Sequence, residues 1–219
     1  MLSTKEIVIV GSTAPDVVKL ISAINRHGSE KFVVKGFLDD DVARHGMSFF
    51  GLPVLGSTQL LEHEYAGMSV INNVARSMSS RDAVVQKLRK LGVTSFPSLI
   101  HPWVDTSYAH IGNGCIIQEG VTLGPGCVIG DHCIIYAHAT IGHESLLADT
   151  IFVANNAVVG ARSSVGRGVF IGLNAVIFPA QAVGSWSTIG AGSVALKSVD
   201  QGVTVFGNPA RRGVLPVSS

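Results

Sequence analysis

An unbroken six-residue repeat runs through the second half of this chain and limits what the chain can fold into. The residue after each aliphatic position is most often glycine, and the residue four positions after it is mostly small. Self-similarity at this period predicts a parallel β-helix, whose coils bury their aliphatic side chains against one another. We expect the glycines to relieve backbone strain at the corners. The aliphatic positions, each six residues from the last, are Ile111, Ile117, Leu123, Ile129, Ile135, Ile141, Leu147, Val153, Val159, Val165, Ile171, Ile177, Val183 and Ile189.

The composition favours the same architecture and excludes several classes of protein. Hydrophobic residues make up 47% of the 219 residues, but aromatic residues only 6%, and there are 25 glycines. Such a chain favours short strands and tight corners over helix bundles. A formal net charge of +1 argues against broad capture of nucleic acid or of an acidic membrane. We find neither an apolar run of bilayer length nor the pattern of a signal peptide, and we expect a cytoplasmic protein without membrane insertion.

Neither the cysteines nor the histidines predict a metal site. Cys115, Cys127 and Cys133 are odd in number, form no C-x-x-C pattern and occupy the small position of the repeat. We therefore interpret them as packed thiols, without disulfides or zinc. His143 is followed four residues later by Leu147, so no H-E-x-x-H zinc motif is present.

The first half of the chain has a different pattern. "KEIVIVG" predicts a buried strand, and "DVVKLISAINRHG" a helix with Asp16 in its first turn and Gly28 at its end. "KFVVKGFLDDD" and "GMSVINNVA" predict two further strands, and "SRDAVVQKLRKLG" a second helix. Alternating strands and helices indicate a parallel α/β domain of Rossmann type over residues 1–100. The β-helix domain then takes residues 101–219, and "ALKSVDQGVTVFGNPARRGVLP" caps its last coil.

An α/β domain followed by hexapeptide coils resembles the PglD/PerB/NeuD-type family of nucleotide-amino-sugar N-acetyltransferases. The resemblance covers nearly the whole chain. It implies a left-handed β-helix with three hexads per coil, acetyl-CoA as the acyl donor, a nucleotide-linked amino sugar as the acceptor, and a homotrimer. The stretches that carry it are Gly11-Ser12-Thr13, "FLDD" at 37–40, "INNVAR" at 71–76, the repeat, "IGHE" at 141–144 and "GNPA" at 207–210.

The resemblance assigns the chemistry to one corner of the repeat. The histidine of the matching pair is the family's general base, so His143 takes that role and Glu144 supports it. An attacking amine must lose a proton as the carbon–nitrogen bond forms, which an imidazole accepts near neutral pH. The family counterpart of the oxyanion donor is the backbone N–H of Ala161. Adjacent strand residues point to opposite faces, so Glu144 reaches the imidazole only if a corner lies between them.

The remaining site residues follow from the same resemblance. Asp39 and Asp40 match the acidic pair that hydrogen-bonds the nucleotide base, although a solvated turn explains them as well. Lys197 and Arg211 are either partners of the CoA phosphates or ordinary solvated cations, and His110, His132 and His138 have no matching role and are expected at the surface or an interface. The first loop, at Gly11, Ser12 and Thr13, packs near the ribose, diphosphate and sugar, and Asn72, Asn73 and Arg76 shape that pocket. The coenzyme groove, between two subunits, is lined by Phe152, Ala161, Leu173 and Ala191.

Two departures keep other functions open. The first loop reads "GSTAPD", with Ala14 and Pro15 where relatives carry further glycines. Since proline lacks an N–H and fixes φ, this loop does not cradle a diphosphate in the usual manner. At Phe152 close relatives carry another histidine. The leading hypothesis is an N-acetyltransferase; the alternatives are a sugar O-acetyltransferase of the sialic acid or polysaccharide type, and a non-catalytic trimeric scaffold.

Overall fold

The structure is a computed structural model that describes residues 3–13 and 15–213. Ala14 of the first loop and the end of the predicted cap, from residue 214, lie outside the described residues. The chain divides into two compact units, Met1–Pro102 and Trp103–Ser219, and each is described by itself. Within the described range, neither helix is long and apolar enough to cross a membrane.

The first unit is built on a sheet in the order β3-β4-β2-β1-β5. All its pairings are parallel except that of β3 with β4. Val8 and Val10 of β1 share a core with Leu88 of α2, while alternation turns Ile7 and Ile9 to the other face. The elements, in chain order, are β1 (Ser3–Val10), α1 (Asp16–His27), β2 (Glu30–Leu38), the 3-10 helix η1 (Val42–Arg44), β3 (Ser48–Phe49), β4 (Leu52–Gly56), the 3-10 helix η2 (Thr58–Glu62), β5 (Ser69–Asn72), α2 (Met78–Lys90) and β6 (Leu99–Ile100).

The three strands and two helices expected in this unit are present. Helix α1 carries Asp16 in its first turn, and the N–H of Gly28 closes its end on the carbonyl of Ile24. The sequence did not predict β3 and β4, which form a hairpin after η1. A parallel α/β unit is therefore established, and its Rossmann type stays a prediction.

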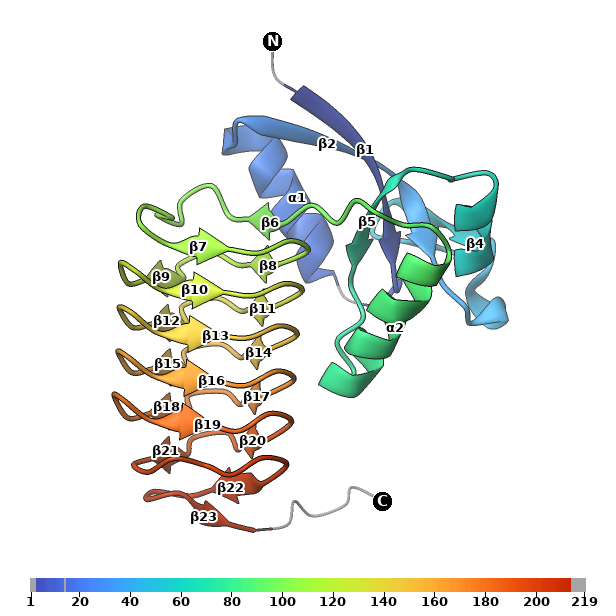
Figure 1. Cartoon of the computed structure of the whole chain (residues 1–219). Helices are drawn as coiled ribbons and strands as arrows, with labels where there is room; N and C mark the ends of the chain where they lie inside the picture. The colour runs from blue at the N-terminus through green and yellow to red at the C-terminus, as the bar shows by residue number, and fades with distance from the viewer. Residues whose placement is uncertain (1–2, 14, 214–219) are drawn as a thin grey trace. The chain divides into compact units, whose positions relative to one another are not determined.

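The second unit is a stack of coils made of strands only two or three residues long (Figure 1). From β7 to β18 each strand pairs in parallel with the strand eighteen residues later, as Ile129 does with Leu147, so one coil contains three hexads. The predicted parallel β-helix is confirmed, and its hand stays a prediction. One stack of strands is β7 (His110–Ile111), β10 (Val128–Ile129), β13 (Leu146–Leu147), β16 (Ser164–Val165) and β19 (Ala182–Val183). A second contains β8 (Ile116–Ile117), β11 (Ile134–Ile135), β14 (Phe152–Val153), β17 (Phe170–Ile171), β20 (Thr188–Ile189), β22 (Thr204–Phe206) and the antiparallel β23 (Arg211–Arg212). The third is β9 (Thr122–Leu123), β12 (Thr140–Ile141), β15 (Val158–Val159), β18 (Val176–Ile177) and β21 (Val194–Ala195).

Two positions of each hexad fill the interior of the coils. The aliphatic position is fully buried in the middle coils, for example at Ile129 and Ile141, and the small position is fully buried at all three cysteines. The three cysteines form no disulfide, and the thiol of Cys133 donates to the carbonyl of Ala148 in the next coil at 3.2 Å. Burial raises the pKa of Cys127. The cysteines are therefore packed thiols, as predicted.

The glycine after each aliphatic residue has a different role from the one predicted. Gly124 and Gly142 do not have positive φ angles. A Cβ on Gly124 would instead lie 2.3 Å from the backbone nitrogen of His143, and one on Gly142 would lie 2.4 Å from that of Ala161. The expectation of strain relief at this position is thus wrong, because glycine is required here for the close approach of consecutive coils. The left-handed backbone falls two residues later in the hexad, for example at Glu144 with φ 57°.

Candidate functional site

The predicted catalytic pair lies at the corner that joins β12 to β13. His143 follows Ile141 by two residues, and Glu144 adopts the left-handed conformation. This turn brings both side chains to one side, where the imidazole Nδ1 lies 3.0 Å from Oε2 of Glu144. The corner that the sequence required between the two residues is therefore present.

The pair faces outward and is open to solvent. The side chain of His143 is 46% exposed and that of Glu144 63%. An Nδ1–H that donates to the carboxylate leaves Nε2 with its lone pair available for a proton. Nε of Arg162 lies 3.8 Å from the same carboxylate oxygen. An open pocket beside the pair is lined by Tyr108, Pro125 and Gly126 in addition to the pair itself.

Ala161 occupies the place of His143 in the next coil. Its backbone nitrogen lies close to Gly142, and it donates no hydrogen bond to any residue that the structure describes. At the corresponding place of another corner the N–H groups are engaged: Asn113 donates to the carboxylate of Asp131 at 2.8 Å, and Asp131 to that of Asp149 at 2.9 Å. The Ala161 amide can therefore donate to a ligand.

The other residues predicted to line the coenzyme groove lie at a different stack. Phe152 belongs to β14, and Leu173 and Ala191 stand two residues after the ends of β17 and β20 of the same stack. The Phe152 ring stacks on Phe170, with centroids 5.0 Å apart, and Leu173 is 50% exposed. Within one chain, Ala161 is thus brought to His143, whereas Phe152, Leu173 and Ala191 form a separate group.

In the first unit, Asp39 faces the first loop. Its Oδ2 accepts hydrogen bonds from the N–H of Ser12 at 3.1 Å and from the Ser12 hydroxyl at 2.6 Å. Oδ1 accepts from the N–H of Asp41 at 3.1 Å, and Nη1 of Arg44 lies 3.8 Å from Oδ2. Burial alone would raise the pKa of Asp39, but these hydrogen bonds and the nearby guanidinium hold that pKa below its ordinary value.

Asp40 points to other elements. Its Oδ1 accepts from the N–H and hydroxyl of Thr58 at 3.0 and 2.7 Å, and its Oδ2 from Lys87 at 2.7 Å. Burial opposes ionisation, yet the contacts with Lys87 and Thr58 lower the pKa of Asp40. The two carboxylates expected to act together are therefore separated, since Asp39 holds the first loop and Asp40 ties η2 to α2.

The two asparagines are buried supports behind the loop. Asn73 donates from Nδ2 to the carbonyl of Gly11 at 3.2 Å, and Asn72 accepts from the N–H of Val74 at 3.0 Å. The fully buried Arg81 donates to the carbonyl of Asn72 at 2.6 Å. Arg81 was not predicted from the sequence; its signal is its position four residues before Val85 on the buried side of α2. Arg76 is exposed.

A pocket opens beside the first loop, and much of its lining comes from residues that the sequence analysis did not single out. Ser12 and Thr13 of the loop line this pocket, and their role toward a substrate stays a prediction. The hairpin of β3 and β4 and the segment before it supply Ala43, Arg44, Met47, Phe49 and Phe50. The available signal was the pair of phenylalanines before Gly51 in an otherwise aromatic-poor chain.

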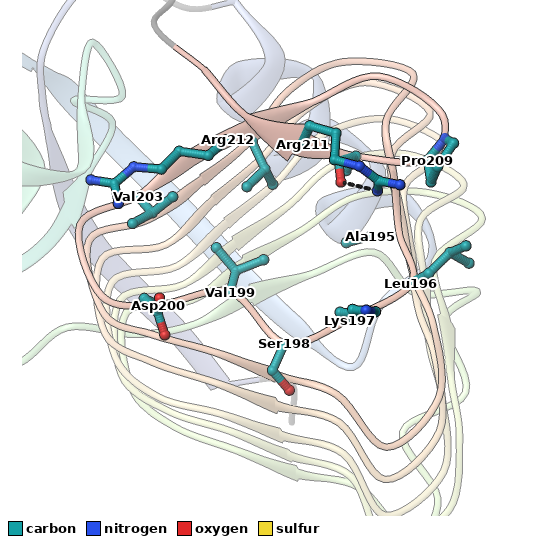
Figure 2. A pocket seen from close by; sticks show the side chains of 12 residues that line it. Ala195, Leu196, Lys197, Ser198, Val199, Asp200, Val203, Pro209, Arg211 and Arg212 are labelled. Carbon is teal, nitrogen blue, oxygen red and sulfur yellow. Dashed lines mark hydrogen bonds between the residues drawn. The ribbon is translucent and has the colours of Figure 1, made fainter.

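The cations proposed for CoA phosphates line a pocket at the end of the coils. Figure 2 shows Lys197 on one side of this pocket, and Arg211 and Arg212 on the strand across it, pointing apart. Val199 and Val203 also line it, and Arg211 donates to the carbonyl of Ala210 at 2.9 Å. The pocket therefore combines apolar side chains with three cations and the carboxylate of Asp200.

The three histidines without a matching role differ in exposure. His110 and His138 are exposed, as expected, but His132 is buried, with 3% of its surface accessible. The expectation for His132 is wrong. His132 and His138 occupy the same left-handed position of their hexads, so the packing of neighbours sets their exposure. Among the described residues, no group of three or more His, Cys, Asp or Glu side chains is placed to hold a metal ion.

Comparisons with known proteins agree with this architecture. Residues 108–143 match the family model described as bacterial transferase hexapeptide (six repeats). The acetyltransferase domain of PglB from Neisseria gonorrhoeae FA1090 is 27% identical, with a TM-score of 0.83 over 95% of this chain and 99% of that chain. The same domain in complex with acetyl coenzyme A has a TM-score of 0.82, over 96% of this chain and 100% of that chain, at 27% identity. No curated protein matches the sequence.

Two further structures are similar in fold. PerB from Caulobacter crescentus, in complex with CoA and GDP-perosamine, is 23% identical with a TM-score of 0.83, over 95% of this chain and 97% of that chain. WeeI from Acinetobacter baumannii AYE is 23% identical with a TM-score of 0.78, over 96% of this chain and 100% of that chain. The predicted resemblance to sugar acetyltransferases is confirmed, and so is the prediction of an acyltransferase.

Proposed function

We propose that this chain is an acetyl-CoA-dependent N-acetyltransferase that acts on the amine of a nucleotide-linked amino sugar. The observation that carries the proposal is the contact of His143 with Glu144 at a solvent-open corner, beside the amide of Ala161. Acetyl-CoA is the donor, because the PglB domain that this chain resembles over nearly its whole length was solved with it. The proposed acceptor, a nucleotide-linked amino sugar, is the one that the family resemblance of the sequence implies.

The geometry supports direct transfer. Nε2 of His143 takes a proton from the amine as its nitrogen attacks the thioester carbonyl carbon, and Nδ1–H stays hydrogen-bonded to Glu144. The N–H of Ala161 donates to the oxyanion that forms. When the tetrahedral intermediate collapses, the carbon–sulfur bond breaks, the amide forms and CoA leaves as the thiolate, which takes up a proton. The thioester is already activated, so no covalent enzyme intermediate is needed.

The separation of the groove residues supports a shared coenzyme site. If one coenzyme touches Ala161 and also Leu173 and Ala191, which lie at another stack, two copies of the chain must supply the two groups. We therefore propose a homotrimer, with a left-handed coil, a Rossmann-type first unit and a cytoplasmic location. Subunit mixing tests the shared site: we expect inactive His143→Gln and inactive Leu173→Glu chains to regain activity when co-assembled, whereas no recovery would refute it.

The decisive assay is thiol release from acetyl-CoA with a panel of amino-sugar nucleotides. We expect turnover by the wild type and a loss of about 10²–10⁴-fold in His143→Gln, as for removal of a general base. His138→Gln is the matched control, because His138 is an exposed histidine at another corner. Turnover by His143→Gln equal to that of the wild type would refute the proposal.

One observation favours a second candidate, an O-acetyltransferase acting on a sugar hydroxyl. The N–H of Ser12 already donates to Asp39, and Pro15 has no N–H, so the first loop offers fewer donors to a diphosphate. Mass spectrometry distinguishes the products, since mild base removes an ester and leaves an amide. The non-catalytic scaffold predicts no tight binding of acetyl-CoA in calorimetry.

A further inference from the structure

An exposed aromatic residue holds an unfavourable backbone conformation at the tip of the β3–β4 hairpin. Phe49 pairs with Leu52, so Phe50 and Gly51 form a two-residue turn, with φ angles of 54° and 79°. Such a turn favours Asn, Asp or Gly at its first position, and a bulky residue there is strained. Phe50 is 52% exposed. Burial in a core therefore does not explain why phenylalanine occupies this position, and strain of this kind is typical of binding sites.

The Phe50 side chain lines the pocket beside the first loop. Met47, itself 50% exposed, and Phe49 extend the apolar side of the pocket, and Ser12 and Arg44 lie on its polar side. A flat, uncharged ring fits such a wall, because an aromatic face stacks on another π-system without needing hydrogen-bond partners.

The polar side chains that could hydrogen-bond to the edge of such a ring already have hydrogen-bond or ion-pair partners within the protein. Both carboxylate oxygens of Asp39 accept hydrogen bonds from the protein, and both oxygens of Asp40 do so as well. Nε of Arg44 lies 3.0 Å from Asp41 and its Nη1 donates to Ser12 at 3.2 Å. The two carboxylates of Asp39 and Asp41 lie near the single guanidinium of Arg44. The local charge therefore does not favour an anion in this pocket.

We propose that Phe50 is the stacking platform for the nucleobase of the acceptor, with Met47 packed against the same ligand. The inference rests on the proposed function and names how that substrate is recognised. Stacking reads the face of a base, which every base has, whereas edge hydrogen bonds distinguish one base from another. The pocket therefore accepts purine and pyrimidine nucleotides with similar affinity.

Phe50→Asn separates stacking from folding. Asparagine suits the first position of this turn, so we expect the melting temperature to stay the same or rise. Loss of stacking raises the Kd for UDP and for GDP, the two probes, by about tenfold or more. With an amino-sugar nucleotide, KM rises while the KM for acetyl-CoA stays unchanged. Phe50→Tyr keeps the affinity, and Val42→Asn, at an apolar residue that is 75% exposed and outside the pocket lining, is the matched control.

Three results would overturn the proposal. The first is unchanged affinity for both probes in a folded Phe50→Asn protein. The second is a preference of more than about a hundredfold between UDP and GDP, which means edge recognition. The third is a changed oligomeric state of Phe50→Asn with unchanged nucleotide binding, which assigns the residue to a contact between copies. If the wild type binds UDP and GDP through Phe50 but acetylates no amino-sugar nucleotide, the proposed function fails while the stacking site stands.

Discussion

Replacing Glu144 by Gln tests how much the carboxylate contributes to the catalytic pair. Gln keeps the length of the side chain and its left-handed backbone, and it still accepts a hydrogen bond from Nδ1 of His143, so only the charge is removed. The side chains are 46% and 63% exposed, and exposed ion pairs contribute about 0.2–1 kcal/mol. Nε of Arg162 lies 3.8 Å from the same oxygen and weakens the effect further. If the ion pair between Glu144 and the protonated imidazole forms fully in the transition state, its loss lowers kcat/KM by about 1.4- to 5-fold.

The comparison with His143→Gln makes this estimate testable. Loss of the base costs about 10²–10⁴-fold, so the two variants should differ by at least an order of magnitude in steady-state thiol release. Circular dichroism and melting temperature confirm that both variants are folded. A loss in Glu144→Gln as large as that in His143→Gln would refute the reasoning, because an exposed supporting carboxylate cannot account for it.

Three other substitutions test the structure around the site. Gly124→Ala places a Cβ 2.3 Å from the backbone nitrogen of His143, so we expect about 1–3 kcal/mol of destabilisation in urea unfolding and reduced turnover. Asp40→Asn weakens the bonds to Thr58, and we expect about 1 kcal/mol lost at pH 7. Because the folded-state pKa of Asp40 is lowered, its stabilising contribution is present above about pH 4 and is lost as the pH falls through the folded pKa; unfolding curves at pH 7 and pH 3 measure this. Arg162→Gln, at a side chain 68% exposed, should leave kcat/KM within about twofold.

The β-helix could be predicted from the sequence because one constraint recurs every six residues. Each aliphatic position must face the interior, so every coil provides a further, independent indication of the same fold. The first unit offers no such repetition. The hairpin around Phe50 escaped prediction because its strands are short and its turn carries phenylalanine where Asn or Asp is the usual signal.

The left-handed backbone that brings Glu144 to His143 could be predicted from the repeat. Glutamate alone does not indicate a left-handed backbone. Aligned hexads do, since the third residue after the aliphatic position is Gly at 114, 120, 126, 168 and 192, all with positive φ. By that alignment Glu144 stands where the chain turns, so the corner was readable from its neighbours. The partners of Asp39 and Asp40 were not readable, because Ser12 and Lys87 are brought to them only by tertiary packing.

The corner that carries the pair recurs in every coil, but of the two positions that flank His143 in this column of corners, only Ala161 has an N–H. Pro125 stands one coil before His143 and Pro179 one coil after Ala161, and neither has an N–H. Between these two prolines, the amides in this column of corners are those of His143 and Ala161. In the proposed mechanism His143 supplies the base, so the Ala161 amide, about 4.8 Å away along the stack, is the group that we propose meets the oxyanion. The close approach permitted by Gly142 sets this spacing, so the glycine that packs the coils also positions the amide used in the proposed chemistry.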